Sequence, residues 1–370
     1  MWTYYFTVGR GLENFAAAAI HKQLLNTDSA SAVIIPGKIL LRTDICPNLP
    51  KLICVERAFS CVCYIPRPWT TPLDRSCRAS VLSDIFKHIT DETSLSSALV
   101  RCQNIVSTVE RSANRFRVYS KCRGSGRYLL DSNRLSLQLA KRIAILMNWR
   151  AVTHKPHFLI SVHINDDYLI AGILLLDKTL ARRGYLLSPG LRSTVCEAMV
   201  SLADLKPGLS LCDPMCGKGT ILIEAARACD DLRLFAFDIE QKAVEETLKA
   251  YNHAGKYFSI NCFQVAFADV SFLPLRSNSF DRIITDLPFG KKFSTFTEVK
   301  RLYPLAVAEF SRVLVNTGRM VLLTSTSLQN DLVKAVDSIP SLNCVEQHPV
   351  SMGDTEAVIF VVRKNENEMK

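Results

Sequence analysis

The stretch LSLCDPMCGKGTILIEAARAC, residues 209–229, decides the fold. Its start, Leu209–Cys212, reads as an apolar strand, and Thr220–Cys229 has the apolar spacing of a helix. Gly217 and Gly219 stand in the turn between them, where glycine lets the backbone approach a ligand closely. In open parallel sheets, ligands bind beyond the carboxyl ends of the strands. The stretch therefore predicts a strand, a ligand-binding turn and a helix.

A single glycine-x-glycine pair is also compatible with a tight turn that binds nothing. The stretch lacks the G-x-G-x-x-G spacing of dinucleotide sites, and Lys218 is not placed as in the phosphate-binding P-loop. Loops that cradle phosphates are therefore disfavoured. The candidate cofactor-binding residues of this turn are Asp213, Pro214, Cys216, Gly217 and Gly219.

Strands and helices alternate strictly downstream of this stretch. The expected strands are nearly continuous apolar runs, as in a parallel sheet whose two faces are covered by helices. They are Leu232–Phe237, Asn261–Phe267, Phe280–Thr285 and Arg319–Thr324, and the expected helices are Gln241–His253 and Glu298–Leu314. Glu356–Arg363 reads as a last strand, paired antiparallel at an edge. The pattern predicts an α/β, doubly wound, Rossmann-like domain.

Two aspartates follow the next strand ends. Asp238 comes about twenty residues after the glycines and can accept hydrogen bonds from both hydroxyls of a ribose, or else cap the next helix. Asp269 can accept from the exocyclic amine of an adenine, or else stabilise a turn. Thr194 stands before the helix expected at Val195–Leu202, where N–H and hydroxyl groups suit a carboxylate. Together they indicate a site for an adenosyl cofactor.

The fourth strand ends in Asp286-Leu287-Pro288-Phe289. An exocyclic amine is a poor nucleophile because its lone pair is delocalised. The Asp286 carboxylate and the Leu287 carbonyl can each accept one N–H and turn that lone pair towards an electrophile. Pro288 fixes the turn, and Phe289 offers a face for a planar base. Read alone, the turn is equally compatible with a structural role, but its place at a strand end favours catalysis.

Charge divides the chain into two halves. The net charge of +10 comes from residues 1–184, which hold 25 basic and 13 acidic side chains, whereas residues 185–370 hold 20 and 22. Such a basic segment is the expected footprint of a module that binds a polyanion, and nucleic acid is the favoured one. Each basic residue can also be an ordinary solvated side chain. The candidate RNA-binding residues are Arg117, Lys121, Arg123, Arg127, Lys141 and Arg142.

The length of 370 residues predicts two or three domains. No run of about 18 apolar residues indicates a membrane span, and the first 20 residues do not read as a targeting peptide. The thirteen cysteines lack C-x-x-C spacing, so we expect reduced thiols and no metal site. We place an α+β region at 1–95, a sheet-and-helix domain at 96–184 and the Rossmann-like domain at 185–370.

Two motifs quoted as they stand, DPMCGKGT (213–220) and DLPFGKK (286–292), resemble the cofactor and catalytic motifs of THUMP-domain RNA guanosine N2-methyltransferases. FRVYSKCRG (116–124) and the hairpin that ends at Lys178 resemble the THUMP domain itself. In the wider amino-methylase pattern, proline stands where this chain has Leu287, so we expect a looser turn. The likeness covers most of residues 100–370 and extends to the N-terminal start.

This resemblance implies a ferredoxin-like region at 1–95, a THUMP domain that grips RNA at 96–184, and an S-adenosyl-L-methionine methyltransferase domain at 185–370. It implies formation of N2-methylguanosine on U6 spliceosomal small nuclear RNA, with tRNA as the alternative substrate. It also implies a small zinc-binding activator subunit as a heterodimer partner, and location in the nucleus, with the cytoplasm as an alternative. A different class remains open: a catalytically silent RNA-binding scaffold.

Overall fold

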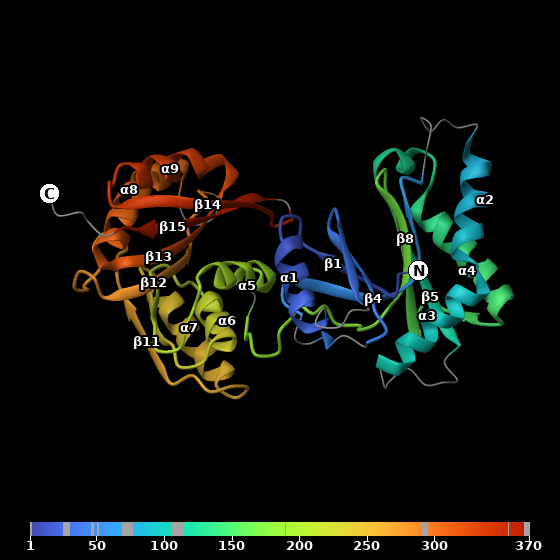
Figure 1. The fold of residues 1–370 in the computed structure, drawn as a ribbon, viewed down its shortest axis with the longest axis horizontal. Coiled ribbons are helices and arrows are strands. Elements are labelled where there is room, and N and C mark those ends of the chain that lie inside the picture. The colour runs from blue at the N-terminus through green and yellow to red at the C-terminus, as the bar shows by residue number, and fades with distance from the viewer. Residues whose placement is uncertain are drawn as a thin grey trace. The chain divides into compact units, whose positions relative to one another are not determined.

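The computed structural model describes residues 2–24, 30–45, 48–49, 52–68, 77–105, 114–188, 190–290, 295–353 and 355–365. The chain forms two compact units (Figure 1). Unit 1 comprises Met1–Val8 and Ala16–Leu180, and unit 2 comprises Gly9–Phe15 and Ala181–Lys370. Across the described ranges, no helix is both long and apolar enough to cross a membrane.

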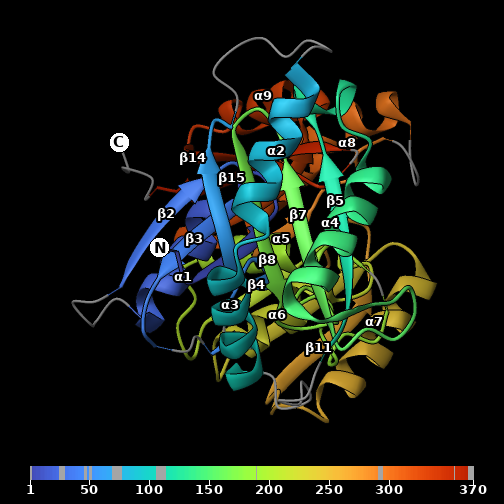
Figure 2. The ribbon, with the colours of Figure 1, turned by 90° about the vertical axis from the view of Figure 1, so that its right-hand side faces the viewer.

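Unit 1 contains an eight-stranded sheet in the order β2-β3-β1-β4-β8-β7-β5-β6. The strands are β1 (Tyr4–Val8), β2 (Ser31–Ile35), β3 (Lys38–Arg42), β4 (Val55–Pro66), β5 (Arg115–Cys122), β6 (Arg150–Ala151), β7 (Phe158–Ile164) and β8 (Tyr168–Leu174). The helices are α1 (Glu13–Leu24), which begins in unit 2, α2 (Arg78–Ile89), α3 (Glu92–Ile105), the short 3-10 helix η3 (Gly124–Tyr128) and α4 (Ser132–Met147). Figure 2 shows α2, α3 and α4 along one side of this sheet.

Local sequence fixes the ends of α4. Asp131 accepts a hydrogen bond from the backbone N–H of Arg134 (2.7 Å) and so caps the N-terminus, while Asn148 ends the helix in a left-handed conformation (φ 51°). Leu135, Leu139 and Ile143 recur every four residues and are buried. The sequence therefore defines α4 at both ends and along its buried face.

The predicted hairpin between β7 and β8 is also confirmed. The strands pair antiparallel up to Ile164 and Leu169, and Asn165 Oδ1 accepts the backbone N–H groups of Asp167 (3.1 Å) and Tyr168 (2.8 Å). Strand β4, from the segment 1–95, pairs with β8, from the segment 96–184, so one sheet runs through both. The division into a ferredoxin-like region and a THUMP domain stays a prediction.

Unit 2 contains a seven-stranded sheet in the order β11-β10-β9-β12-β13-β15-β14. The strands are β9 (Ser210–Asp213), β10 (Arg233–Asp238), β11 (Cys262–Phe267), β12 (Phe280–Asp286), β13 (Leu314–Ser325), β14 (Leu342–Ser351) and β15 (Glu356–Lys364). The helices are α5 (Ser193–Leu202), α6 (Thr220–Ala228), α7 (Gln241–Ala254), α8 (Phe296–Val313) and α9 (Gln329–Asp337), with a short 3-10 helix, η4 (Thr326–Leu328). In Figure 1, α5–α7 lie on one face of the sheet and α8 and α9 on the other. The expected doubly wound α/β architecture is confirmed.

The end of the sheet differs from the expectation. Strand β15 pairs antiparallel as predicted, but it lies between β13 and β14, so its expected edge position is wrong. The edge strand is β14, in which polar residues such as Glu346, Gln347 and His348 hide the pattern. Because β15 is flanked on both sides, its central residues are buried, as its apolar sequence requires.

Candidate active site

The turn after β9 is held by its glycines. Gly217 and Gly219 have left-handed backbones, with φ of 52° and 70°. A Cβ on Gly219 would lie 2.9 Å from the Thr247 methyl group on α7, so only glycine fits there. Thr247 in turn donates its hydroxyl to the Gly217 carbonyl (2.9 Å) and lies 3.5 Å from the Cys216 sulfur. The turn therefore packs closely against the middle of α7.

Asp238, at the end of β10, ties this turn to the neighbouring strand. Its Oδ2 accepts the Gly217 N–H and its Oδ1 accepts the Glu240 N–H, both at 2.9 Å. A carboxylate has about four acceptor positions, so two remain for a ligand. The Cys216 N–H donates to the Phe237 carbonyl (2.9 Å) and closes the same junction. The structure thus brings the predicted glycine turn and Asp238 together.

The remaining predicted cofactor residues differ in exposure. Asp269 is exposed, and its Oδ1 accepts both the N–H and the hydroxyl of Ser271 (2.8 and 2.7 Å), so it stabilises a turn. Its second oxygen is bonded to none of the described residues. Pro214 and Thr194 are buried, and Thr194 lies in the first turn of α5.

Sequence reasoning missed two apolar residues beside these acids. Ile239 follows Asp238 directly and is 57% exposed, and Phe267, the register partner of Asp238 on β11, is 59% exposed. Exposed apolar side chains at the carboxyl ends of two neighbouring strands offer a surface for an adenine ring. The sequence did carry a signal for both residues: Ile239 stands next to Asp238, and Phe267 stands two residues before Asp269.

Two carboxyl groups, that of the buried Asp213 and that of the half-buried Asp286, lie at the ends of the adjacent parallel strands β9 and β12. Asp213 accepts the Thr285 hydroxyl (2.7 Å) and the Met215 N–H (3.2 Å) on Oδ1. Its Oδ2 and the Oδ1 of Asp286 are buried and bond to none of the described residues. Burial raises the pKa of Asp213 to about 7, and burial together with the charge of Asp213 raises that of Asp286 to about 8.

The turn 287–289 is fixed at two backbone atoms. The Leu287 N–H donates to the Leu323 carbonyl (2.9 Å), a bond that a proline at this position could not make. The Tyr303 hydroxyl of α8 donates to the Pro288 carbonyl (2.9 Å). A phenol has one proton, so the Thr324 hydroxyl, 2.7 Å away, donates to the Tyr303 oxygen. The looser turn that we expected from Leu287 is therefore braced by bonds that the sequence did not show.

The geometry leaves two acceptors for an incoming amine. The Leu287 side chain is buried, and its carbonyl oxygen receives no hydrogen bond from the described residues, whereas the Pro288 carbonyl is already occupied. The unpartnered Asp286 oxygen belongs to the residue just before it. Phe289 is half-buried, and Lys291 and Lys292 of the predicted motif lie outside the described residues.

The predicted RNA-binding residues belong to unit 1 and do not form one cluster. Arg117 and Lys121 alternate on the exposed face of β5, with Tyr119 between them, and Arg123 follows the strand. Arg127 lies over the ring of Tyr128, 4.9 Å from its centroid. Tyr119 was missed, although its alternation with two basic residues was readable from the sequence.

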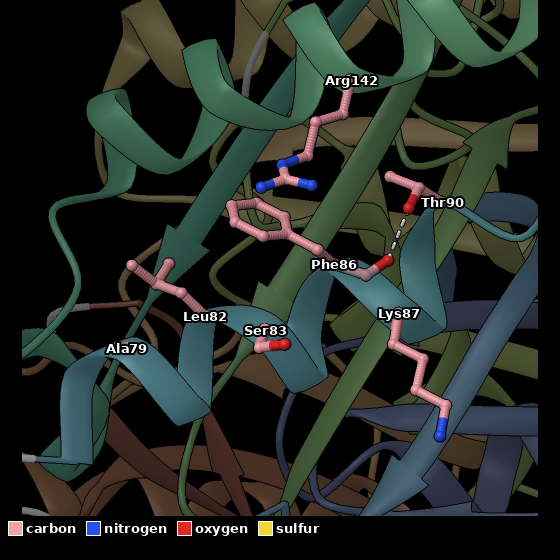
Figure 3. A pocket seen from close by; sticks show the side chains of 7 residues that line it. All are labelled: Ala79, Leu82, Ser83, Phe86, Lys87, Thr90 and Arg142. Carbon is pink, nitrogen blue, oxygen red and sulfur yellow. Dashed lines mark hydrogen bonds between the residues drawn. The ribbon is translucent and has the colours of Figure 1, made fainter.

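Arg142 and Lys141 are exposed residues of α4. The Arg142 guanidinium lies 4.1 Å from the centroid of the Phe86 ring of α2 (Figure 3). Arg142 and Phe86 line a groove of about 390 Å³ together with Ser83, Lys87 and Thr90, whereas Lys141 does not line it. This groove belongs to unit 1, so it is not the cavity of the candidate active site. As for metals, the described residues contain no group of three or more His, Cys, Asp or Glu side chains placed to hold an ion.

Comparison with known proteins agrees with the motifs. Residues 181–357 match the family UPF0020, described as RMKL-like, methyltransferase domain. The chain is 34% identical over 233 residues to the U6 snRNA (guanine-N(2))-methyltransferase THUMPD2 of Homo sapiens, covering 63% of this chain and 45% of that protein. It is 29% identical over 297 residues to the tRNA (guanine(6)-N(2))-methyltransferase THUMP3 of Homo sapiens, covering 77% and 56%.

A solved structure shares the fold over nearly the whole chain. TrmN from Thermus thermophilus superposes with a TM-score of 0.75 at 20% identity and covers 98% of this chain and 99% of that one. The fold expected from the motifs is thereby confirmed. This chain spans about half the length of the curated relatives that it matches.

Proposed function

We propose that this chain, whose residues 181–357 match the RMKL-like methyltransferase domain family, transfers a methyl group from S-adenosyl-L-methionine to the N2 amine of a guanine in RNA. One observation carries the proposal. The unpartnered Asp286 carboxyl oxygen and the unoccupied Leu287 carbonyl follow one another at the end of β12, beside the glycine turn of β9. Two adjacent acceptors fit the two N–H bonds of an exocyclic amine.

The residues of the candidate site fit the proposed cofactor. Asp238 retains free acceptor positions for the two ribose hydroxyls, and the second oxygen of Asp269 suits an adenine amine. Ile239 and Phe267 offer apolar surface on either side. The first turn of α5, which holds Thr194, suits the cofactor carboxylate. When bound, S-adenosyl-L-methionine supplies an electrophilic methyl group.

The protein's own groups orient the amine and accept the proton that it loses after methylation. In its ionised form, the minority form at neutral pH because its pKa is raised to about 8, Asp286 accepts one N–H of the amine. The Leu287 carbonyl accepts the other, and the two bonds direct the nitrogen lone pair towards the methyl group. The alkylated nitrogen then has one proton too many. The raised pKa of Asp286, about 8, lets its carboxylate take up that proton at neutral pH before passing it to water. The Phe289 ring supplies a stacking face for the guanine.

The proposed substrate is a structured RNA, with U6 small nuclear RNA first and tRNA second. Two relatives carry these two activities in their names, and the U6 enzyme is the more similar in identity. The excess of basic residues before residue 185 favours RNA over a protein amide. We accordingly propose a ferredoxin-like region at 1–95, a THUMP domain at 96–184, a catalytic domain at 185–370 and a nuclear location.

We also propose that a small zinc-binding activator subunit forms a heterodimer with this chain, as the family resemblance implies. Co-expression should raise the yield and the cofactor affinity of the chain. Size-exclusion chromatography with light scattering should then give the mass of a one-to-one complex. A chain that stays monomeric and equally stable beside the activator would contradict this partner.

The test of the reaction is tritium transfer from labelled cofactor to in vitro transcribed U6 RNA and tRNA. The wild-type chain with its activator should label RNA, and the Asp286→Ala variant should not. Undiminished transfer by the variant would refute the assignment of Asp286. Isothermal titration separates the enzyme from a silent scaffold, because a scaffold would bind RNA without binding S-adenosyl-L-methionine.

A further inference from the structure

Lys38, the first residue of β3, is a buried lysine in unit 1 with no counter-charge. Its side chain is 5% exposed. Among the described residues, none forms an ion pair or a hydrogen bond with its ammonium group, which lies 5.3 Å from the centroid of the Tyr168 ring. A largely buried charge without a partner in the protein lowers stability unless a bound anion compensates it.

The neighbours of Lys38 add positive charge. His163 of β7 contacts the Tyr168 ring edge-on, with centroids 5.4 Å apart. Lys121 of β5 is the register partner of His163, so both side chains lie on the same face of the sheet. Arg123 follows two residues after Lys121. We call these four residues, Lys38, Lys121, Arg123 and His163, the Lys38 cluster.

The electrostatics of the Lys38 cluster are one-sided. Burial, followed by the charges of Lys38, Lys121 and Arg123, lowers the pKa of His163 to about 3. Burial, followed by the charge of Lys121, lowers the pKa of Lys38 to about 8. The charges that act on each group are positive, and none of the described carboxylates forms an ion pair with Lys38, Lys121 or Arg123. An anion bound among these groups would relieve this repulsion.

The surroundings of the cluster favour a nucleic acid as the source of that anion. Tyr119 is 51% exposed and stands between Arg117 and Lys121 on the open face of β5. An exposed aromatic ring between two cations suits a stacked base beside its phosphates. A free inorganic anion would make no use of this ring.

We propose that the Lys38 cluster binds a backbone phosphate of the RNA substrate. The proposal rests on the RNA substrate proposed above and assigns it a contact in unit 1. Lys38 supplies charge from beneath the site, Lys121 and Arg123 close over the phosphate, and neutral His163 donates one N–H. The neighbouring base stacks on Tyr119.

The test is Lys38→Met, which keeps the length of the side chain and removes its charge. RNA affinity, measured by fluorescence anisotropy with labelled U6 RNA, should fall about tenfold at moderate salt. The slope of log affinity against log salt should become shallower by about one phosphate contact. The matched control is Lys22→Met on α1, an exposed lysine, which should change the affinity little.

The same variant should be more stable than the wild type, because it removes an unpaired buried charge. All three tryptophans, Trp2, Trp69 and Trp149, fall within the sequence ranges of unit 1, so tryptophan fluorescence follows the melting of that unit. The melting temperature should rise in Lys38→Met and stay unchanged in Lys22→Met. A lysine kept only for structure would give the opposite result, a lower melting temperature. That outcome, or RNA affinity equal to the control, would overturn the inference.

Inorganic pyrophosphate separates this site from the proposed substrate. It should raise the melting temperature of unit 1 in the wild type and not in Lys38→Met, whether or not the chain methylates RNA. Protection by pyrophosphate in a wild type that binds no RNA would refute the RNA substrate and the phosphate contact proposed here. Absence of protection would refute the anion site itself.

Discussion

Replacing Asp286 by Asn should make unit 2 more stable while it abolishes methyl transfer. The Asp286 carboxyl is buried, and burial together with Asp213 raises its pKa from 3.8 to about 8. Between these two pH values the folded protein holds a proton that the unfolded chain has lost. Stability is therefore full below the unfolded pKa and falls as the pH rises through the folded pKa.

The magnitude follows from this window. One proton difference changes the free energy of unfolding by about 1.4 kcal/mol per pH unit. From pH ~5 to pH ~8 the wild type should lose about 4 kcal/mol through this group. That value is an upper limit. Asp213, with a pKa of about 7, interacts with Asp286, so the two carboxyl groups titrate together and the change in stability cannot be assigned to Asp286 alone. Asparagine cannot ionise, so the advantage of Asp286→Asn should grow with pH.

Calorimetry at several pH values measures this difference. Tryptophan fluorescence identifies the transition of unit 1, and the remaining transition belongs to unit 2. Tritium transfer to RNA and isothermal titration with S-adenosyl-L-methionine are measured on the same samples. Transfer should be lost while cofactor binding persists. An Asn variant that is less stable than the wild type at pH ~8, or that keeps the wild-type pH slope, would refute the reasoning.

Asp281, on the same strand β12, supplies the matched control. Burial acts to raise its pKa, but the Ser210 hydroxyl and N–H, at 2.6 and 2.8 Å from its Oδ2, lower the pKa below its usual value. Asp281→Asn should therefore destabilise unit 2, and the loss should be greatest above the unfolded pKa and vanish in acid. Replacing aspartate by asparagine is thus expected to stabilise unit 2 at Asp286, at the end of β12, and to destabilise it at Asp281, near the start of the same strand.

Two further variants test contacts that hold the site in place: the hydrogen bond from Tyr303 to the Pro288 carbonyl and the packing of Gly219 against Thr247. Tyr303→Phe should lower the rate of methyl transfer about tenfold or more without changing cofactor affinity, because a misplaced acceptor carbonyl costs mainly the transition state. The control is Tyr251→Phe, which also removes a hydroxyl bonded to a carbonyl and should leave the rate unchanged. Equal rates in the two variants would contradict the role of the Tyr303 hydroxyl. Gly219→Ala should weaken cofactor binding in isothermal titration, because its Cβ meets Thr247 at 2.9 Å. Gly208→Ala, with φ of 85° and open space around its Cβ, has the same backbone strain and should leave cofactor binding unchanged.

The parallel part of unit 2 was readable from the sequence for a physical reason. Strands covered on both faces must be apolar throughout, so each strand and the polar residue that ends it stand out. Asp213, Asp238 and Asp286 were found in this way. The antiparallel edge strand β14 was not predicted, because one of its faces is open and its polar residues interrupt the apolar run expected of a strand.

Two residues with proposed roles, Tyr303 in unit 2 and Lys38 in unit 1, could not be identified from the sequence. Tyr303 lies on the helix after the candidate catalytic turn, and nothing in the sequence around it distinguishes it from a core tyrosine. Lys38 reads as the polar start of a strand, and its burial depends on the packing of strands that are distant in sequence. Contacts between distant segments decide both roles, so only a structure could assign them.

Mass spectrometry of nucleosides tests the central claim most directly. U6 RNA and tRNA transcripts are incubated with S-adenosyl-L-methionine, activator and either the wild type or Asp286→Asn, and then digested to nucleosides. N2-methylguanosine should be formed by the wild type alone. Formation of another methylated nucleoside instead, or equal N2-methylguanosine from both proteins, would contradict the account.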